Sequence, residues 1–337
     1  MFIRNIIFIL LGLTLLFAIL GCGSVDAAVQ SDNNLISDDD LIYVGFIQVG
    51  AESDWRIANT NSMQATFTEE KGYQFEIVDA QQQTTKQITA IRDFIQKGVD
   101  YIILAPNTET GWDTALGEAN EAGIPVIIVD RMIDTDDDRL FAAWIGSDFL
   151  QEGRDGVKAL EKILADKGVS DEDIVNMVTL QGTIGSSPQI GRTQGFEEGC
   201  AKHPNWNMLD RQSGDFTQER GQEVMESMLK TFDDIDVVIS ENDNMTFGAI
   251  AAIEAAGKTC GPDGEIIIVN WDGSKKAFDY MIDGKINVIV ECNPLHGPRV
   301  EELIKALKAG KSVDKKSYVT EKTFWPDQAA QLRESRF

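Results

Sequence analysis

The sequence predicts an α/β protein made of two doubly wound lobes, each built around a parallel β-sheet. Short apolar runs rich in Val and Ile alternate with stretches of helical periodicity. In one such stretch Ile88, Ile91 and Ile95 fall on one helix face, and Gly98 stands where a glycine commonly ends a helix. Apolar strands that alternate with helices are typical of a parallel sheet covered on both faces. The strands of the first half are expected at residues 41–47, 75–78, 101–105, 126–129 and 141–146.

The same alternation repeats in the second half of the chain, which predicts a second lobe. The first lobe is expected to end near Ser147. Two lobes leave a cleft between them, and such a cleft is a preferred place for a small-molecule site. The second-half strands are expected at 174–181, 208–212, 237–240, 266–270 and 287–291, with helices at about 189–201, 217–231, 244–256, 274–283 and 298–309.

The composition narrows the class of partner. The chain has 337 residues, enough for two domains with their own cores, and its formal net charge is −25. A charge of this sign argues against nucleic acid or an anionic membrane surface as a binding partner. It suits a protein that works outside the cytosol, which we expect to be a monomer.

The N-terminus has the pattern of a secretory signal. Arg4 precedes an apolar run at 6–20, and the residues at 19–22, Ile-Leu-Gly-Cys, resemble a bacterial lipobox. We therefore expect a signal peptide at 1–21, lipidation at Cys22, and a lipid-anchored flexible tether at 22–40. The protein would then lie outside the cytoplasm, either anchored to the cell membrane through its lipid alone or in the periplasm. The alternative is an uncleaved membrane anchor, for which the run is short.

The remaining cysteines and the acidic segments give no metal site. Cys200 and Cys260 are the better candidates for a disulfide, because both lie near predicted helix ends in the same half, and Cys292 is expected to be a buried thiol. Residues 134–138 begin like a calcium loop, but Arg139 and Ile145 replace the glycine and the glutamate that such a loop needs. We expect a solvated turn there, and neither a metal nor a cofactor.

Polar and aromatic residues follow one predicted strand after another. Trp55-Arg56, Asp130-Arg131, Asn242 and Asp272 all stand just beyond the carboxyl end of a strand. In open α/β sheets ligands bind at this edge. A planar aromatic ring together with charged donors and acceptors suits a polyhydroxylated ring, whose face stacks while its hydroxyls form hydrogen bonds.

Other features leave alternatives open. The segment 182–187, Gly-Thr-Ile-Gly-Ser-Ser, could cradle a phosphate, but it lacks a P-loop lysine, and we favour a turn that aims Arg192 into the cleft. Trp271 is a candidate for the opposite wall of the cleft. The histidines His203 and His296 show no catalytic pattern, so we expect no enzyme. A glycoside hydrolase remains the rival, with paired carboxylates drawn from the following candidates: Glu52, Asp130, Asp272 and Glu291.

Several strings resemble one known family. They are Val-Gly-Phe-Ile-Gln-Val-Gly at 44–50, Trp-Arg at 55–56, Val-Asp-Arg at 129–131, Ser-Gly-Asp-Phe-Thr at 213–217, Glu-Asn-Asp-Asn-Met at 241–245 and Trp-Asp-Gly at 271–273. Over residues 40–330 the chain resembles the ribose-type periplasmic sugar-binding proteins of ABC importers. Within that family it is most similar to the branch that binds galactofuranose. The segment ahead of the first strand holds no DNA-binding helix-turn-helix, which removes the repressors of the same fold.

The resemblance implies a set of sugar-binding residues. Trp55 would stack on the sugar and Arg56 would donate to a hydroxyl, while Asp130 and Arg131 would hold ring hydroxyls from the first lobe. Glu291 stands where ribose binders carry a glutamine near the hinge, so ribose itself is a doubtful ligand. The other expected members of the set are Glu52, Asn107, Arg192, Asn242 and Asp272.

The implied domain organisation is two lobes joined by a hinge of several strands, with the ligand in the cleft between them. The N-terminal lobe would comprise 41–147 plus 292–318, and the C-terminal lobe 148–291 plus 319–337. The implied function is capture of a monosaccharide, galactofuranose or a related sugar, by hinge closure and its delivery to an ABC permease. The alternatives are a sugar-sensing subunit for a chemoreceptor or sensor kinase, and the hydrolase.

Overall fold

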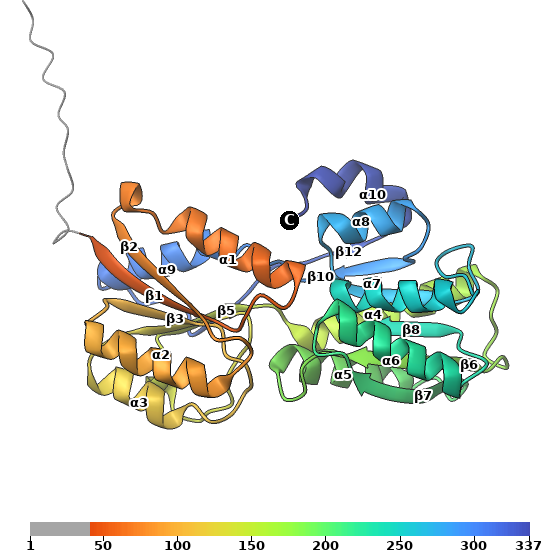
Figure 1. The fold of residues 1–337 in the computed structure, drawn as a ribbon, viewed down its shortest axis with the longest axis horizontal. Coiled ribbons are helices and arrows are strands. Elements are labelled where there is room, and N and C mark those ends of the chain that lie inside the picture. The colour runs from red at the N-terminus through yellow and green to blue at the C-terminus, as the bar shows by residue number, and fades with distance from the viewer. Residues whose placement is uncertain (1–40) are drawn as a thin grey trace, which may run out of the picture. The chain divides into compact units, whose positions relative to one another are not determined.

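The computed structural model describes residues 41–337, which form two α/β lobes (Figure 1). The predicted signal peptide, tether and lipidation site at Cys22 lie outside these residues. Each lobe has a six-stranded sheet, with strand order β11-β5-β4-β3-β1-β2 in the first and β12-β10-β9-β8-β6-β7 in the second. All strand pairs are parallel except that of β10 with β12. The predicted fold class is therefore confirmed.

The first sheet is covered by helices on both faces. Its strands are β1 (Ile42–Gln48), β2 (Tyr73–Asp79), β3 (Tyr101–Leu104), β4 (Val126–Val129), β5 (Ala143–Gly146) and β11 (Lys316–Tyr318). Its helices are α1 (Asp54–Thr66), α2 (Thr84–Lys97), α3 (Asp113–Glu121) and α9 (Gly297–Lys308), with short 3₁₀ turns at Glu69–Lys71 and Asp138–Leu140. One apolar core lies between the sheet and the α2–α3 pair, and a second lies under α1 and α9.

The second sheet repeats this layering. Its strands are β6 (Val175–Gln181), β7 (Trp206–Ser213), β8 (Val237–Ser240), β9 (Ile267–Asp272), β10 (Val288–Glu291) and β12 (Thr323–Phe324). Its helices are α4 (Phe149–Asp166), α5 (Ser187–Cys200), α6 (Gln218–Thr231), α7 (Asp243–Ala255), α8 (Lys275–Ile282) and α10 (Pro326–Leu332), followed by a 3₁₀ turn at Arg333–Ser335. The helices α4 and α5 cover one face, and α6, α7, α8 and α10 cover the other.

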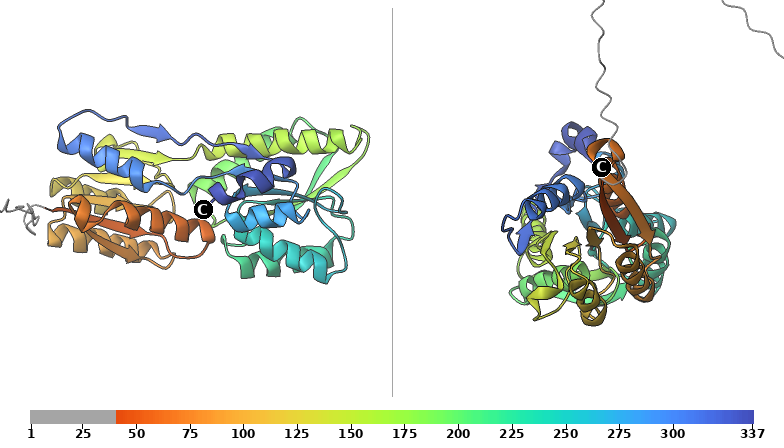
Figure 2. Two further views of the ribbon diagram at one scale, coloured as in Figure 1. Left: turned by 90° about the horizontal axis from the view of Figure 1, so that it is seen from above. Right: turned by 90° about the vertical axis from the view of Figure 1, so that its left-hand side faces the viewer.

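The chain crosses between the two sheets three times. It passes from β5 into α4, from β10 into α9, and from β11 into β12. Figure 2 shows the returning C-terminal segment, which places α9 beside the first sheet and α10 beside the second. The lobe limits given above stay a prediction about which segments move together.

The structure corrects several expectations. Cys200, Cys260 and Cys292 are all free thiols, so the expected disulfide between Cys200 and Cys260 is wrong. The physical reason is the layering, because Cys200 belongs to the core under α4 and α5, whereas Cys260 lies in the core on the opposite face of the sheet. The strands β11 and β12 were not predicted, since they are only three and two residues long and lack an apolar run.

Trp271 does not form a wall of the cleft. It is fully buried between the second sheet and the helices α4 and α5, and its indole nitrogen donates to the Glu152 carbonyl at 3.2 Å. The helix α4 approaches closely enough that a Cβ atom at Gly156 would lie 2.4 Å from the Trp271 ring. The described residues contain no helix that is both long and apolar enough to cross a membrane.

Candidate functional site

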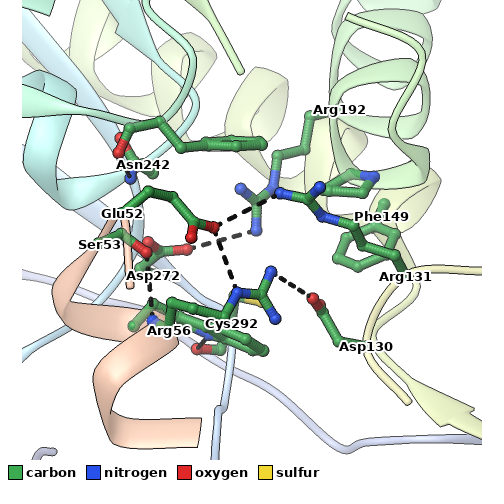
Figure 3. A pocket seen from close by; sticks show the side chains of 13 residues that line it. Glu52, Ser53, Arg56, Asp130, Arg131, Phe149, Arg192, Asn242, Asp272 and Cys292 are labelled. Carbon is green, nitrogen blue, oxygen red and sulfur yellow. Dashed lines mark hydrogen bonds and ion pairs between the residues drawn. The ribbon is translucent and has the colours of Figure 1, made fainter. Parts of the chain in front are cut away.

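A pocket lies where the carboxyl ends of the strands of both sheets meet, and Figure 3 shows its lining. The space between the lining residues measures about 310 Å³, solvent at its mouth included. The lining residues are Glu52, Ser53, Trp55, Arg56, Asp130, Arg131, Phe149, Pro188, Arg192, Phe216, Asn242, Asp272 and Cys292.

The start of helix α1 brings an arginine to the pocket. Ser53 is the N-cap of α1, and its hydroxyl accepts a hydrogen bond from the Arg56 backbone N–H at 3.2 Å. The Arg56 guanidinium lies 3.2 Å from Glu52 Oε1 through Nε and 2.8 Å from Asp130 Oδ2 through Nη2. All three side chains are almost completely buried. The helix start therefore supplies a cation that pairs with two carboxylates in the pocket wall.

Arg131 forms the neighbouring part of the same wall. Its Nη1 donates to the Asn107 carbonyl at 2.8 Å, and its Nη2 lies 3.8 Å from Glu52 Oε1. Burial, and then the positive charge of Arg56, lowers the pKa of Arg131 to about 10, so the guanidinium stays charged at neutral pH. Asn107 also accepts from Arg131 through its side-chain oxygen at 3.3 Å. Asn107 thus supports Arg131 from behind and does not line the pocket itself.

Arg192 occupies the corresponding position in the second lobe. It comes from α5, and its Nε donates to Glu152 Oε2 at 2.6 Å while its Nη2 lies 3.5 Å from Asp272 Oδ1. Its Nη1 donates to the Glu241 carbonyl. Burial raises the pKa of the Asp272 carboxyl well above its usual range, which the nearby Arg192 opposes. The expectation that the loop at 182–187 aims Arg192 toward the cleft agrees with this geometry.

Three pocket residues hold their backbones in the left-handed region that side chains disfavour. The φ angles are +60° at Asp130, +61° at Phe216 and +97° at Asp272. Each such conformation costs roughly 1–3 kcal/mol and persists where the surroundings enforce it, commonly at functional sites. For Asp272 the enforcing group is Asp243, whose Oδ2 accepts from the Ser274 backbone N–H at 2.6 Å.

Aromatic rings supply the apolar surface. Trp55 is buried, its indole N–H donates to the Cys292 carbonyl at 2.9 Å, and its ring meets the His296 ring edge-on. Two further lining rings lie under guanidinium groups: the Arg192 guanidinium lies over the Phe149 ring, and the Arg131 guanidinium lies over the Phe216 ring. Phe149 and Phe216 were not among the predicted site residues. Phe216 stands in one of the family strings, but a phenylalanine beside a helix is usually core.

Several polar atoms at the pocket are buried and unpaired. Glu52 Oε2, Arg56 Nη1 and Arg131 Nε have no hydrogen-bond partner among residues 41–337. A buried polar group left without a partner costs about 1–3 kcal/mol. The pocket therefore offers both acceptors and donors whose pairing is incomplete, which favours a ligand carrying several hydroxyl groups.

The predicted site residues separate into three groups. Eight of them line the pocket: Glu52, Trp55, Arg56, Asp130, Arg131, Arg192, Asn242 and Asp272. Asn242 lines it while serving as the N-cap of α7, with its Oδ1 accepting from Met245 N and its Nδ2 donating to Phe216 O. Asn107 lies behind Arg131. Glu291 is outside the pocket, because its carboxylate pairs with Arg336 at 3.0 Å and accepts from the Lys322 backbone N–H.

Hydrogen bonds between the lobes surround the pocket. Asn244 at the start of α7 accepts from the Asp54 backbone N–H at 2.9 Å. The Ser187 hydroxyl accepts from the Met132 backbone N–H at 2.9 Å. A further backbone bond runs from Glu109 N–H to the carbonyl at residue 185 at 3.1 Å. These bonds hold the lobes together over the pocket.

Fold and site together define a two-lobed binding protein for a small polar molecule. The chain belongs to the periplasmic binding protein family, whose domain description, "Periplasmic binding protein domain", matches residues 44–297. It is 38% identical to the galactofuranose-binding protein YtfQ of Escherichia coli (strain K12), over 87% of this chain and 91% of that protein. It is 30% identical to the fructose import binding protein FruE of Bifidobacterium longum (strain NCC 2705), over 92% and 90%.

Solved structures give the same relationship. A Mycobacterium smegmatis protein in complex with β-D-fucofuranose is 44% identical and superposes with a TM-score of 0.82, covering 86% of this chain and 93% of that one. The binding component of the arabinose ABC transporter of Shewanella sp. ANA-3, bound to L-arabinofuranose, is 40% identical with a TM-score of 0.81, covering 87% and 95%.

The charge cluster of the first lobe yields a prediction about stability. Arg56→Leu would leave Glu52 and Asp130 buried beside one remaining guanidinium. Removing one partner from a buried ion cluster typically costs about 3–5 kcal/mol, so we expect a loss of that size in the free energy of unfolding, measured by urea denaturation. The control is Arg92→Leu, which breaks the exposed pair with Glu118 and should change little. Equal losses of unfolding free energy in the two variants would show that the buried carboxylates do not depend on the Arg56 charge.

Proposed function

We propose that this protein captures a monosaccharide in its furanose form and delivers it to the permease of an ABC importer. The observation that carries the proposal is the pocket, where buried, incompletely paired guanidinium and carboxylate atoms lie between aromatic rings of both lobes. The three pocket arginines are matched by three pocket carboxylates, which suits an uncharged ligand. Relatives bound to fucofuranose and arabinofuranose support the furanose form.

In this proposal residues of both lobes contact the sugar. Arg56 and Arg131 donate to hydroxyls through the atoms that lack partners, and Asp130 accepts from a hydroxyl. Trp55 packs from the first lobe, while Phe149 and Phe216 form the apolar walls contributed by the second lobe and its boundary. A flat ring with hydroxyls at its rim satisfies both kinds of surface at once.

The proposed mechanism is a shift of a hinge equilibrium. The sugar touches residues of both lobes only when the lobes are closed, so it binds the closed form better and increases its population. Sugar-binding relatives that import their ligand support delivery to a permease over a sensing role. In the sensor alternative, the closed form with its bound sugar would bind a receptor and not a permease. The hydrolase alternative would require turnover, and we expect none with nitrophenyl glycosides.

The proposal predicts which sugars stabilise the protein. L-Arabinose, D-fucose and D-galactose, which reach the furanose form in solution, should raise the melting temperature more than D-glucose, which is almost entirely pyranose in solution, because a ligand that binds only the native state stabilises it. Small-angle scattering with the best sugar should give a smaller radius of gyration as the hinge closes. A larger shift with D-glucose would contradict the furanose preference, and an unchanged radius would contradict closure.

Arg131 should matter for affinity. Hydrogen bonds to charged groups are worth about 1.5–3 kcal/mol, so Arg131→Ala should weaken binding of the best sugar at least about tenfold in titration calorimetry. The matched control is Arg139→Ala, which removes an exposed guanidinium and should leave affinity unchanged. Unchanged affinity in a folded Arg131→Ala variant would remove Arg131 from the proposed contacts.

The lipid anchor is a separate part of the proposal. Cys22 is proposed to carry the lipid and to be the first residue of the mature protein, which would hold the binding domain at the outer side of the membrane. Intact mass of the membrane-extracted protein should show a chain that begins at Cys22 with a lipid adduct. A mass that includes residues 1–21, or that lacks an adduct, would contradict the anchor and leave the sugar site unaffected.

A further inference from the structure

One carboxyl group joins the three segments that cross between the sheets. Glu321, in the β11–β12 crossing, accepts through Oε1 from the Ser147 hydroxyl at 2.7 Å and from the Asn293 backbone N–H at 2.7 Å. Ser147 belongs to the β5–α4 crossing and Asn293 to the β10–α9 crossing. The Ser147 hydroxyl also lies 3.4 Å from Cys292 Sγ. A single side chain therefore fixes all three crossings to one another.

A second carboxyl group lies against this junction. A carboxylate oxygen of Glu152, an oxygen of Glu321 and Cys292 Sγ lie within 4.8 Å of one another. Glu152 uses Oε2 to accept from Arg192, and its Oε1 is buried without a hydrogen-bond partner among the described residues. Glu152 is only 3% exposed. The unpaired oxygen thus has a donor nearby only if Glu321 or Cys292 carries a proton toward it.

The charges around the junction favour a proton between the carboxyl groups of Glu152 and Glu321. Arg192 contacts the junction through Glu152 at 2.6 Å, and its guanidinium is shared with Asp272 at 3.5 Å. Two like charges this close and this poorly solvated cannot both be retained at low cost. The other charged groups around the adjoining surface hollow are mostly acidic: Asp148, Asp155, Glu291 and Lys322. The guanidinium of Arg336 is already paired with Glu291 at 3.0 Å, so it supplies no spare positive charge to the junction.

We propose that Glu321 is a positioning residue of the sugar site: its carboxyl group stays protonated, shares that proton with Glu152, and so holds the three crossings and Arg192 in the arrangement of the closed pocket. A bound cation would serve the junction less well, because the Arg192 guanidinium already lies 2.6 Å from Glu152. The part of this inference that concerns sugar rests on the function proposed above.

The proton affinities agree with the geometry. Burial, and then the charge of Glu152, raises the pKa of Glu321 from 4.5 to about 9, and burial also raises the pKa of Glu152. A carboxyl group with a raised folded-state pKa stabilises the protein fully below pH 4.5. That contribution is lost progressively as the pH rises toward 9.

The test compares the wild type with Glu321→Gln and Glu321→Leu in the absence of sugar. Glutamine keeps the acceptor for Ser147 and Asn293 and a donor for Glu152 but cannot ionise. At pH 5 the melting temperatures of wild type and Glu321→Gln should agree. At pH 9 the wild type should melt at least about 2 °C below Glu321→Gln, and Glu321→Leu should be less stable at both values. Glu302→Gln, an exposed change on α9, should follow the wild type.

If the melting temperatures of the wild type and Glu321→Gln depend on pH in the same way, the proposal that Glu321 shares a proton with Glu152 is wrong. A rise in melting temperature on adding Zn²⁺ that Glu321→Gln abolishes would also overturn it, because the junction would then be a metal site. The sugar arm repeats the calorimetry with the sugar giving the largest thermal shift. Affinity should fall more than about threefold from pH 6 to pH 9 in the wild type and stay flat in Glu321→Gln. If no sugar binds, the proposed function fails. The sugar-free comparison of melting temperatures still shows whether Glu321 carries the shared proton.

Discussion

The arrangement of the pocket depends on the burial of three guanidinium groups between two sheets. Arg56, Arg131 and Arg192 are each at most 3% exposed, and an unpaired buried charge would cost several kcal/mol. Each guanidinium therefore has carboxylates or carbonyls around it. Because the compensation comes from within the protein, the remaining demand is for neutral hydrogen-bonding partners. A sugar meets that demand, whereas an anionic or cationic ligand would upset the balance.

Both lobes position their carboxylates in the same way. Asp130 follows β4 and Asp272 ends β9, and each has a left-handed backbone that turns its side chain into the pocket. The strain at Asp130 is held by Trp144, whose indole N–H donates to the Asp130 carbonyl at 3.1 Å. It is also held by Gly146, where a Cβ atom would lie 2.4 Å from that carbonyl. Residues behind the pocket, which do not line it, thus decide where the carboxylates of the pocket wall lie.

The sequence was sufficient for the order of β1 to β10, because buried parallel strands are continuous apolar runs. The same property hid the orientation of Glu291, since every residue of β10 is buried and no alternation indicates which side chain faces the cleft. Phe149 and Phe216 were missed because a phenylalanine has no polar pattern to separate a pocket wall from a core. The positive φ angles at Asp130 and Asp272 leave no mark in the sequence either, because neither position is a glycine.

Under the proposed hinge mechanism, the balance between open and closed forms depends on a few hydrogen bonds. The hydrogen bonds from Asp54 to Asn244, from Met132 to Ser187 and from Glu109 to residue 185 join the lobes. At about 0.5–1.5 kcal/mol each, these three bonds contribute roughly 1.5–4.5 kcal/mol in total. Closing without sugar buries the unpaired atoms at the pocket, at about 1–3 kcal/mol each. For the three unpaired atoms this cost is roughly 3–9 kcal/mol in total, which exceeds what the three bonds supply, so the hydrogen bonds that a sugar adds would decide whether the closed form prevails.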